Sequence, residues 1–323
     1  MSGCLGALFG RLGRPQLLKV PVLGVGASGK TTFAWGLGRT LVDREWGHSA
    51  DESAGYFLKI DAALLNNRNP EATSGQTPLV FLCEKCAFAD GTPELSRIVS
   101  LLGSRDGGGA AGSDPPVRYA GDLGEYDSFT WSFRRPMRIS TYDMSGSQFE
   151  NCMRVFDTAS ANPESDPEVR RFMDIVRGSD GLIVIVDLAR RITSRQAFTA
   201  LRAEERERHL LGALAEQVMP LCRGVARALA ANPNMAGKPI IFAYTKHDIH
   251  CLSDEQVRRM LETAYAPLFA SLRRRNVLVE HCCLAYEGVH RDESTGEVRF
   301  GVRGTNELLA KLVVGLLESR SGH

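Results

Sequence analysis

The sequence lacks a strong charge of either sign, a long apolar stretch and an evident targeting segment. Its 323 residues carry 39 lysines and arginines against 38 aspartates and glutamates, a net charge of +1. This balance provides no electrostatic field for nucleic acid or for an acidic partner, and we expect neither. No apolar run reaches the roughly 18 residues of a membrane-spanning helix, and no cleavable signal sequence is evident. We therefore expect a cytoplasmic protein.

Cysteines are present but do not form a recognisable metal or disulfide framework. The eight are scattered, and Cys83-x-x-Cys86 is the single CxxC pair, with no second pair at zinc-ribbon spacing. Cys282 and Cys283 follow His281 but stand in an apolar run. We favour buried, reduced thiols over a metal site at these positions.

The segment Lys19–Thr32, KVPVLGVGASGKTT, organises the rest of the chain. It predicts a short buried strand, a glycine-rich loop and the start of a helix. The pattern GxxxxGK followed by Ser or Thr is met by Gly24, Gly29, Lys30 and Thr31. The strand and helix around it favour a phosphate-binding loop over an ordinary glycine-rich turn.

Each residue type in this loop has a physical role. Glycines let backbone N–H groups turn inward around a phosphate, and the following helix points its positive end at the same anion. The Lys30 side chain can reach the β- and γ-phosphates, and the Thr31 hydroxyl can ligate Mg²⁺. The residues that we expect around the phosphates are Gly24, Gly26, Ala27, Ser28, Gly29, Lys30, Thr31 and Thr32.

Apolar runs alternate with helical patterns, which predicts a doubly wound, mostly parallel α/β sheet with helices on both faces. The 43% apolar content is enough for a sizeable core. Ligands of such sheets bind at the carboxyl ends of the strands. We expect strands at 19–23, 79–86, 129–142, 181–187, 239–244 and 277–284. We expect helices at 30–43, near 57–65, and at 93–102, 147–178 with an interruption at about 161–167, 196–231, 254–273 and 305–317.

The chain is expected to form one domain over residues 19–318. An insertion near 91–128 contains a glycine- and proline-rich run at about 103–118, which is typical of a mobile loop. A long helical stretch covers 190–237.

Residues 1–18 form a leader with an open role. Four apolar residues at helical spacing allow a weak peripheral contact with a membrane, and Cys4 could carry a fatty acid. We favour a frayed or core-docked leader over that contact. The four residues are Leu5, Leu8, Phe9 and Leu12.

A DxxG motif, Asp143-Met-Ser-Gly146, falls where a predicted strand ends. Its Asp can hold Mg²⁺, usually through water, and its Gly can offer a backbone N–H to a γ-phosphate. The motif is weak alone, and its place after the phosphate loop strengthens it.

A second strand-end motif, Thr245-Lys246-His247-Asp248, follows the apolar run PIIFAY. The Asp248 carboxylate can accept hydrogen bonds from the ring N–H and the exocyclic amine of guanine, a pair that adenine lacks. The Lys246 stem can lie along the base. A polar turn is the alternative, and the order of the motifs favours guanine recognition. The backbone N–H groups that could reach the guanine carbonyl belong to Cys283, Leu284 and Ala285.

This order of motifs resembles the translation-factor-like (TRAFAC) class of P-loop GTPases, and most closely the Ras/Arf-like small GTPases and their divergent bacterial relatives. The resemblance spans about 19–317, with insertions. It implies a switch that binds GTP or GDP with Mg²⁺ and hydrolyses GTP slowly, with a protein effector or activating protein as partner. It assigns Mg²⁺ to Thr31 and Asp143, the γ-phosphate to Gly146 and the base to Asp248.

The class also takes one metal-ligating threonine from its first switch loop, for which Thr73 and Thr77 both qualify, and we lean to Thr73. Our catalytic candidates are Lys30 and Gln148. Class members often place Gln directly after DxxG to orient the attacking water, whereas Gln148 stands one position later and would point in another direction. Thr245 replaces a more usual Asn, so we expect a weaker tie between the base and phosphate loops.

Three hypotheses follow. The first is a GTPase switch. The second is a scaffold that holds a nucleotide with little hydrolysis, as the displaced Gln148 suggests. The third is a P-loop ATPase or kinase, which explains the phosphate loop and leaves the TKHD motif unused. Nucleotide preference and turnover separate the three.

Overall fold

The computed structural model describes most of the chain from Leu17 to Ser321. All structural statements below concern these residues: 17–65, 77–89, 92–103, 117–119, 128–143, 145–158, 165–190, 192, 195–246, 252–291 and 298–321.

Strand β2 (Val22–Leu23) lies inside a nine-stranded sheet. It runs parallel to β6 (Ser128–Asp143) on one side and to β7 (Leu182–Asp187) on the other. The parallel part continues through β8 (Pro239–Thr245) and β9 (Leu278–Cys283). The remaining strands are β1 (Leu17–Lys19), parallel to β6, and the antiparallel β3 (Gly47–Ser49), β4 (Thr77–Ala89) and β5 (Val117–Tyr119). The carboxyl ends of β2, β6, β7, β8 and β9 therefore share one edge.

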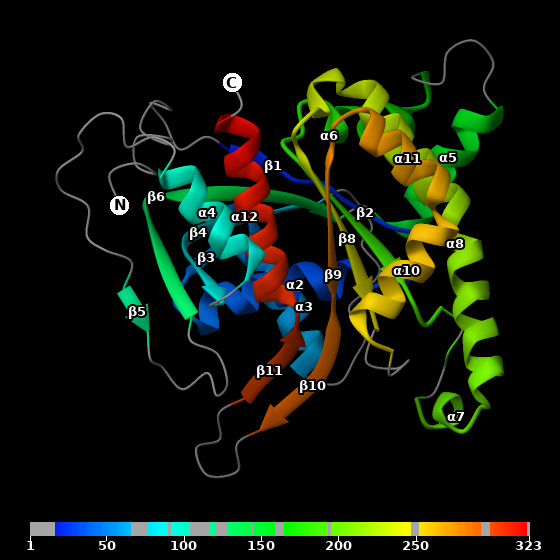
Figure 1. The fold of residues 1–323 in the computed structure, drawn as a ribbon, viewed down its shortest axis with the longest axis horizontal. Helices are drawn as coiled ribbons and strands as arrows, with labels where there is room; N and C mark the ends of the chain where they lie inside the picture. Colours follow the sequence, from blue (N-terminus) through cyan, green and yellow to red (C-terminus); the bar gives the residue numbers. More distant parts are fainter. Residues whose placement is uncertain are drawn as a thin grey trace.

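Helices bury both faces of this sheet, so the predicted doubly wound fold is confirmed (Figure 1). Side chains alternate along β7: Ile183 and Ile185 enter one core, and Val184 and Val186 enter the other. The first core is covered by α2 (Lys30–Asp43), α3 (Asp51–Leu65), α4 (Pro93–Gly103) and α12 (Thr305–Ser321). The second is covered by α5 (Gly146–Thr158), α6 (Pro167–Val176), α8 (Ala203–Ala231), α10 (Asp254–Ala264) and α11 (Ala266–Arg274). Two short helices, α7 (Arg195–Thr199) and η2 (Pro233–Met235), flank α8.

Helix α2 has the predicted bounds and anchors the glycine loop that precedes it. Its predicted inner face, Phe33, Leu37 and Leu41, is buried. Gly38 lies where α2 meets α3 and β4: a Cβ there would approach Phe57 Cε2 to 2.5 Å and Phe81 Cε1 to 2.7 Å. This close packing fixes the helix, and with it the loop, against the sheet.

Part of the predicted insertion is regular structure. Helix α4 packs on α12, and Arg97 Nε of α4 donates to Glu318 Oε1 of α12 at 2.7 Å. The same guanidinium pairs with Glu280 of β9, so α4 is tied to two core elements. Most of the run at 103–118 lies outside the described residues.

Prolines account for two boundaries that differ from prediction. The strand expected at 19–23 is divided into β1 and β2, with Pro21 between them, and β1 begins within the predicted leader. The helix expected at 254–273 is divided at Tyr265. Pro267, in the first turn of α11, lacks the N–H that a continuous helix requires.

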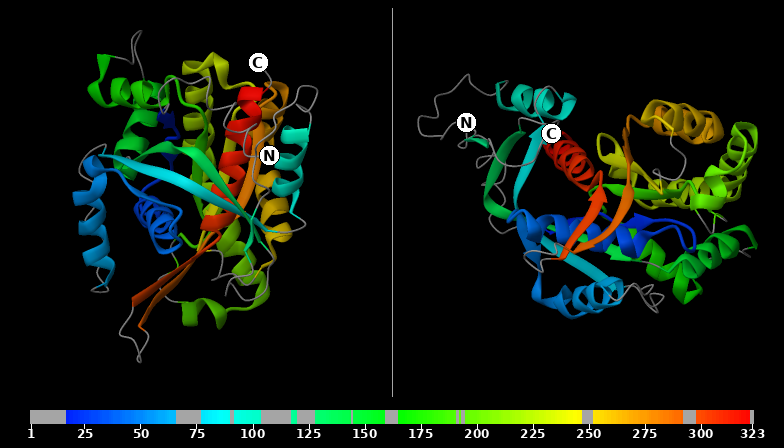
Figure 2. Two further views of the ribbon diagram at one scale, coloured as in Figure 1. Left: turned by 90° about the vertical axis from the view of Figure 1, so that its left-hand side faces the viewer. Right: turned by 90° about the horizontal axis from the view of Figure 1, so that it is seen from below.

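A two-stranded sheet was not predicted. Strands β10 (Ala285–Arg291) and β11 (Val298–Arg303) pair antiparallel and extend away from the main sheet (Figure 2). Separately, none of the helices in the described part of the chain is long and apolar enough to span a membrane.

Candidate functional site

The loop between β2 and α2 turns through two left-handed residues. Ala27 and Gly29 have φ angles of 58° and 87°. Left-handed residues in such a loop turn successive backbone N–H groups to one side, an arrangement that binds anions. Gly29 is also the N-cap of α2 and has no side chain to cap the first-turn amides. A loop and helix start of this geometry can bind an anion through backbone amides.

Close packing inside this loop requires glycine at position 24. A Cβ on Gly24 would lie 2.7 Å from Ser28 Oγ and 3.3 Å from Ile185 Cβ. Ser28 Oγ is buried and has no hydrogen-bond partner among the described residues. An unpaired buried hydroxyl is costly, and a phosphate oxygen is a partner of suitable chemistry. The loop therefore fits a phosphate group.

Lys30 begins α2 and folds over the loop. Its Nζ donates to the carbonyl oxygens of Gly24 and Val25, each at 2.9 Å, and the residue is 6% exposed. These bonds place the ammonium group at the loop, where its charge favours an anion. Thr31 and Thr32 follow in the first helical turn and are half-buried.

Thr245, the last residue of β8, connects the TKHD segment to this loop. Its Oγ1 donates to Ser28 O at 2.9 Å, and the residue is buried. We expected a weaker tie from threonine here, and the structure has a direct hydrogen bond. The next residue, Lys246, is left-handed with φ of 61°. Asp248, the predicted base-recognition residue, lies outside the described residues.

Asp187 at the end of β7 was missed in the sequence analysis. It is 1% exposed, its Oδ1 accepts the Ala189 N–H at 2.9 Å, and its Oδ2 lies 2.7 Å from Lys246 Nζ. Gln217 of α8 accepts the Asp187 N–H at 2.9 Å and donates to the Asp187 carbonyl at 2.7 Å. The sequence did contain a signal for this residue: a carboxylate at the end of a buried apolar run. A buried charge is seldom found without a partner. Asp187 positions the Lys246 side chain.

Replacing Thr245 by Val should weaken nucleotide binding by about 3–10-fold and lower the free energy of unfolding by about 1 kcal/mol. The valine keeps the shape but leaves Ser28 O without its donor, so the loop is less firmly held. Nucleotide titration and thermal unfolding measure the two effects. Thr245→Ser retains the hydroxyl and is the matched control. Equal behaviour of the valine and serine variants would show that the hydrogen bond has no role.

The first residue of the DxxG motif, Asp143, ends the strand β6 that pairs with β2. Asp143 ends β6 and is in register with Val22 of β2 and with Thr77 of β4. This register brings the backbones of two predicted metal ligands to the edge that holds the phosphate loop. Their side chains, and the whole of Thr73, lie outside the described part of the structure.

Gln148 takes part in the start of α5, which begins at Gly146. Its Oε1 accepts the Ser145 N–H at 3.3 Å, and Ser145 Oγ accepts the Gln148 N–H at 3.2 Å. This reciprocal pair is a capping box. The side chain proposed to orient water thus has a structural hydrogen bond at the helix start.

The segment Cys283-Leu284-Ala285 lies next to β8. The Leu284 N–H donates to Tyr244 O at 2.7 Å, and Leu284 and Ala285 are buried. Burial raises the pKa of the neighbouring Cys282 thiol well above its ordinary value. No cluster of three or more His, Cys, Asp or Glu residues able to hold a metal occurs among the described residues. Cys282 is buried, as we expected from its place in an apolar run.

The environment of His281 leads us to expect that the folded protein is less stable in acid. Burial, with smaller contributions from Arg258 and Lys311, lowers its pKa from 6.5 to about 4, and its Nδ1 is hydrogen-bonded to Tyr244 Oη. Between pH 6.5 and 4 the unfolded chain binds a proton that the folded protein does not. The free energy of unfolding should therefore fall by about 2 kcal/mol across this window.

Thermal unfolding of the native chain and of His281→Gln at several pH values tests this. The variant should lose less stability than the native chain as the pH falls. Parallel curves for the two proteins would rule out His281 as the source.

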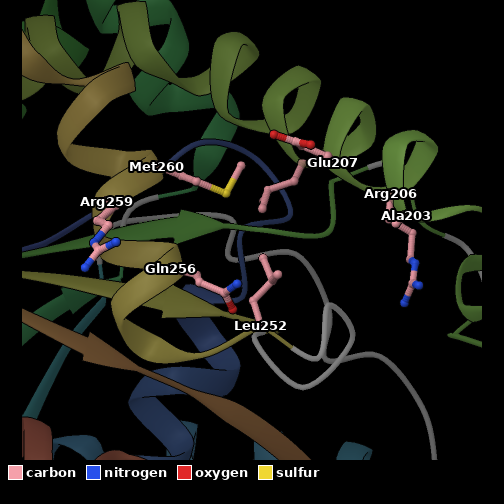
Figure 3. Close-up of a pocket in the computed structure, with 8 residues that line it drawn as sticks. Ala203, Arg206, Glu207, Leu252, Gln256, Arg259 and Met260 are labelled. Atoms are coloured by element: carbon pink, nitrogen blue, oxygen red, sulfur yellow. The ribbon is translucent and has the colours of Figure 1, made fainter.

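A pocket of about 550 Å³ lies between α8 and α10 (Figure 3). Its lining combines apolar side chains with two arginines, and it contains no residue of the phosphate loop. The lining residues are Ala203, Arg206, Glu207, Leu210, Leu252, Gln256, Arg259 and Met260. It is thus a separate feature from the loop described above.

Comparisons with known proteins leave the family of the chain open. No protein-family model matches the sequence, and no curated protein matches it. One structural neighbour is the ADP-ribosylation factor-like GTP-binding protein, small COPII coat GTPase SAR1, from Encephalitozoon cuniculi, in complex with GDP. It is 10% identical, the match covers 99% of this chain and 83% of that one, and the TM-score is 0.28. A likeness at this level assigns no function.

Proposed function

We propose that the chain is a guanine-nucleotide switch of the P-loop GTPase class, which binds GTP or GDP with Mg²⁺ and hydrolyses GTP slowly. The observation that carries the proposal is the junction between the phosphate loop and the segment after β8. Thr245 donates a hydrogen bond directly to Ser28 O, so the segment proposed to recognise the base adjoins the loop proposed to bind the phosphates. A single bound nucleotide requires this proximity, because its base and its phosphates belong to one molecule.

The residues have distinct roles in this proposal. The loop amides and Lys30 would hold and orient the phosphates, and Asp248 would recognise guanine. Thr31 and Asp143, with Thr73 or Thr77, would hold Mg²⁺. When bound there, Mg²⁺ would neutralise part of the negative charge of the phosphates. Catalysis would rest on positioning and on charge stabilisation.

A nucleotide-holding scaffold is the second candidate, and the capping box of Gln148 favours it. Because Gln148 Oε1 accepts the Ser145 N–H at the helix start, this side chain is poorly placed to orient a water molecule for attack on GTP. Under the switch proposal an activating protein supplies much of the rate. We also propose that residues 19–318 form one cytoplasmic domain, with a protein partner and without a nucleic-acid partner. For the leader we favour a frayed or core-docked segment over a peripheral membrane contact.

The test begins with the nucleotide released when the purified protein is denatured, followed by single-turnover phosphate release with Mg²⁺. We expect guanine nucleotide and slow release of phosphate from GTP. Bound guanine nucleotide with no release over hours, with or without cell extract, would favour the scaffold. Adenine nucleotide would favour an ATPase or kinase.

A further inference from the structure

Both backbone groups of Gly26, in the middle of the phosphate loop, are hydrogen-bonded to charged side chains. Glu150 Oε1 of α5 accepts the Gly26 N–H at 3.0 Å. Arg190 Nη1, in the turn after β7, donates to the Gly26 carbonyl at 3.1 Å. Arg190 Nη2 and Glu150 Oε1 are 3.8 Å apart. Two elements that are distant in the sequence therefore meet on one residue of the loop.

The Glu150 carboxylate is an anion of the chain itself, placed against the phosphate loop. Backbone N–H groups of such a loop favour negative charge, so a carboxylate there competes with a phosphate and repels it. The Glu150 side chain is 44% exposed. Exposed ion pairs contribute little to stability, so a ligand can replace this contact without unfolding the protein.

Arg190 keeps its place if Glu150 leaves. Its Nε lies 3.2 Å from Glu216 Oε2 of α8, and its hydrogen bond to the Gly26 carbonyl is independent of Glu150. A guanidinium has five N–H donors in a fixed planar array. It can therefore retain these two contacts and still donate to a phosphate oxygen beside the loop.

We propose that Glu150 and Arg190 form an electrostatic gate on the phosphate loop. This inference rests on the proposed function, the binding of a nucleoside polyphosphate at the loop, and adds Glu150 and Arg190 to that site. The terminal phosphate displaces the Glu150 carboxylate, and Arg190 then faces that phosphate. Because Glu150 belongs to α5, its displacement releases the contact between α5 and the loop. Phosphate occupancy and the position of α5 are thereby coupled.

Displacement titrations with GTP, ATP, inorganic tripolyphosphate and guanosine test the gate. Glu150→Gln removes the competing charge and should raise affinity for the three polyphosphates by about 3–10-fold, with guanosine unchanged. Arg190→Gln should lower polyphosphate affinity by about 10-fold. Glu207→Gln removes one carboxylate from an exposed position of α8, away from the loop, so it should change affinity less than about two-fold.

Hydrogen exchange gives a second readout that does not depend on turnover. Adding polyphosphate should increase exchange in the first turns of α5 in the native chain. Glu150→Ala, which also removes the acceptor of the Gly26 N–H, should show this increase without ligand. Equal effects of Glu150→Gln and Glu207→Gln on polyphosphate affinity, or no effect of Glu150→Gln, would overturn the gate.

The two proposals fail in different ways. A native chain that binds ATP as well as GTP ends the guanine proposal, while the gate is still judged on ATP and tripolyphosphate. A native chain that binds no polyphosphate at all ends both.

Discussion

Replacing Lys30 by Ala should reduce nucleotide affinity by at least about 100-fold, which is the largest effect we expect from one substitution. The ammonium group is buried and held by the carbonyls of Gly24 and Val25. In the proposed complex the same ammonium group donates to phosphate oxygens. A charge-assisted hydrogen bond contributes about 1.5–3 kcal/mol, so the loss of two such bonds to phosphate gives this magnitude. Titration with a fluorescent guanine nucleotide measures it.

Two further variants separate binding from folding. Lys30→Met keeps most of the apolar stem and should bind as poorly as the alanine variant, with better thermal stability. Lys59→Ala removes a lysine from the exposed surface of α3 and should leave affinity unchanged. Retained affinity in a folded Lys30→Met protein would show that the loop does not bind phosphate as described.

Replacing Asp248 by Asn should reverse the base preference, with GTP affinity lowered by about 100-fold or more. An aspartate accepts from both the ring N–H and the exocyclic amine of guanine. Asparagine offers one acceptor and one donor, which matches the ring N–H and the C2 carbonyl of xanthine. Competition between GTP and XTP on the two proteins measures the change.

Asp174→Asn is the matched control, because it makes the same substitution on an exposed position of α6. It should leave the preference for GTP intact. An Asp248→Asn protein that still prefers GTP to XTP would place base recognition elsewhere in the chain.

The buried strands and the long helices could be predicted because their signals are local. The run Leu182–Asp187 is apolar at every position but its last, as a strand covered on both faces requires. Helix α2 carries its inner face at regular spacing after a glycine that ends the loop. The ribbon of β10 and β11 has no such pattern, because it does not lie between two helical layers.

The contacts within the site were less predictable. Asp187, Glu150 and Arg190 are single charged residues, and only the folded sheet brings them to the edge that holds the phosphate loop. Gln148 shows the opposite difficulty: its motif position suggested catalysis, whereas the backbone amide of Ser145 lies within reach. Residue type indicates which chemistry is possible, and tertiary contacts decide which partner a side chain meets.

The most direct test of the account is competition between GTP and ATP for the unmodified protein in the presence of Mg²⁺. A loop that holds polyphosphates beside a guanine-specific carboxylate predicts that GTP displaces a bound fluorescent guanine nucleotide at concentrations at least about 100-fold lower than ATP does. Equal displacement by the two nucleotides, or failure of GTP to bind, would contradict it.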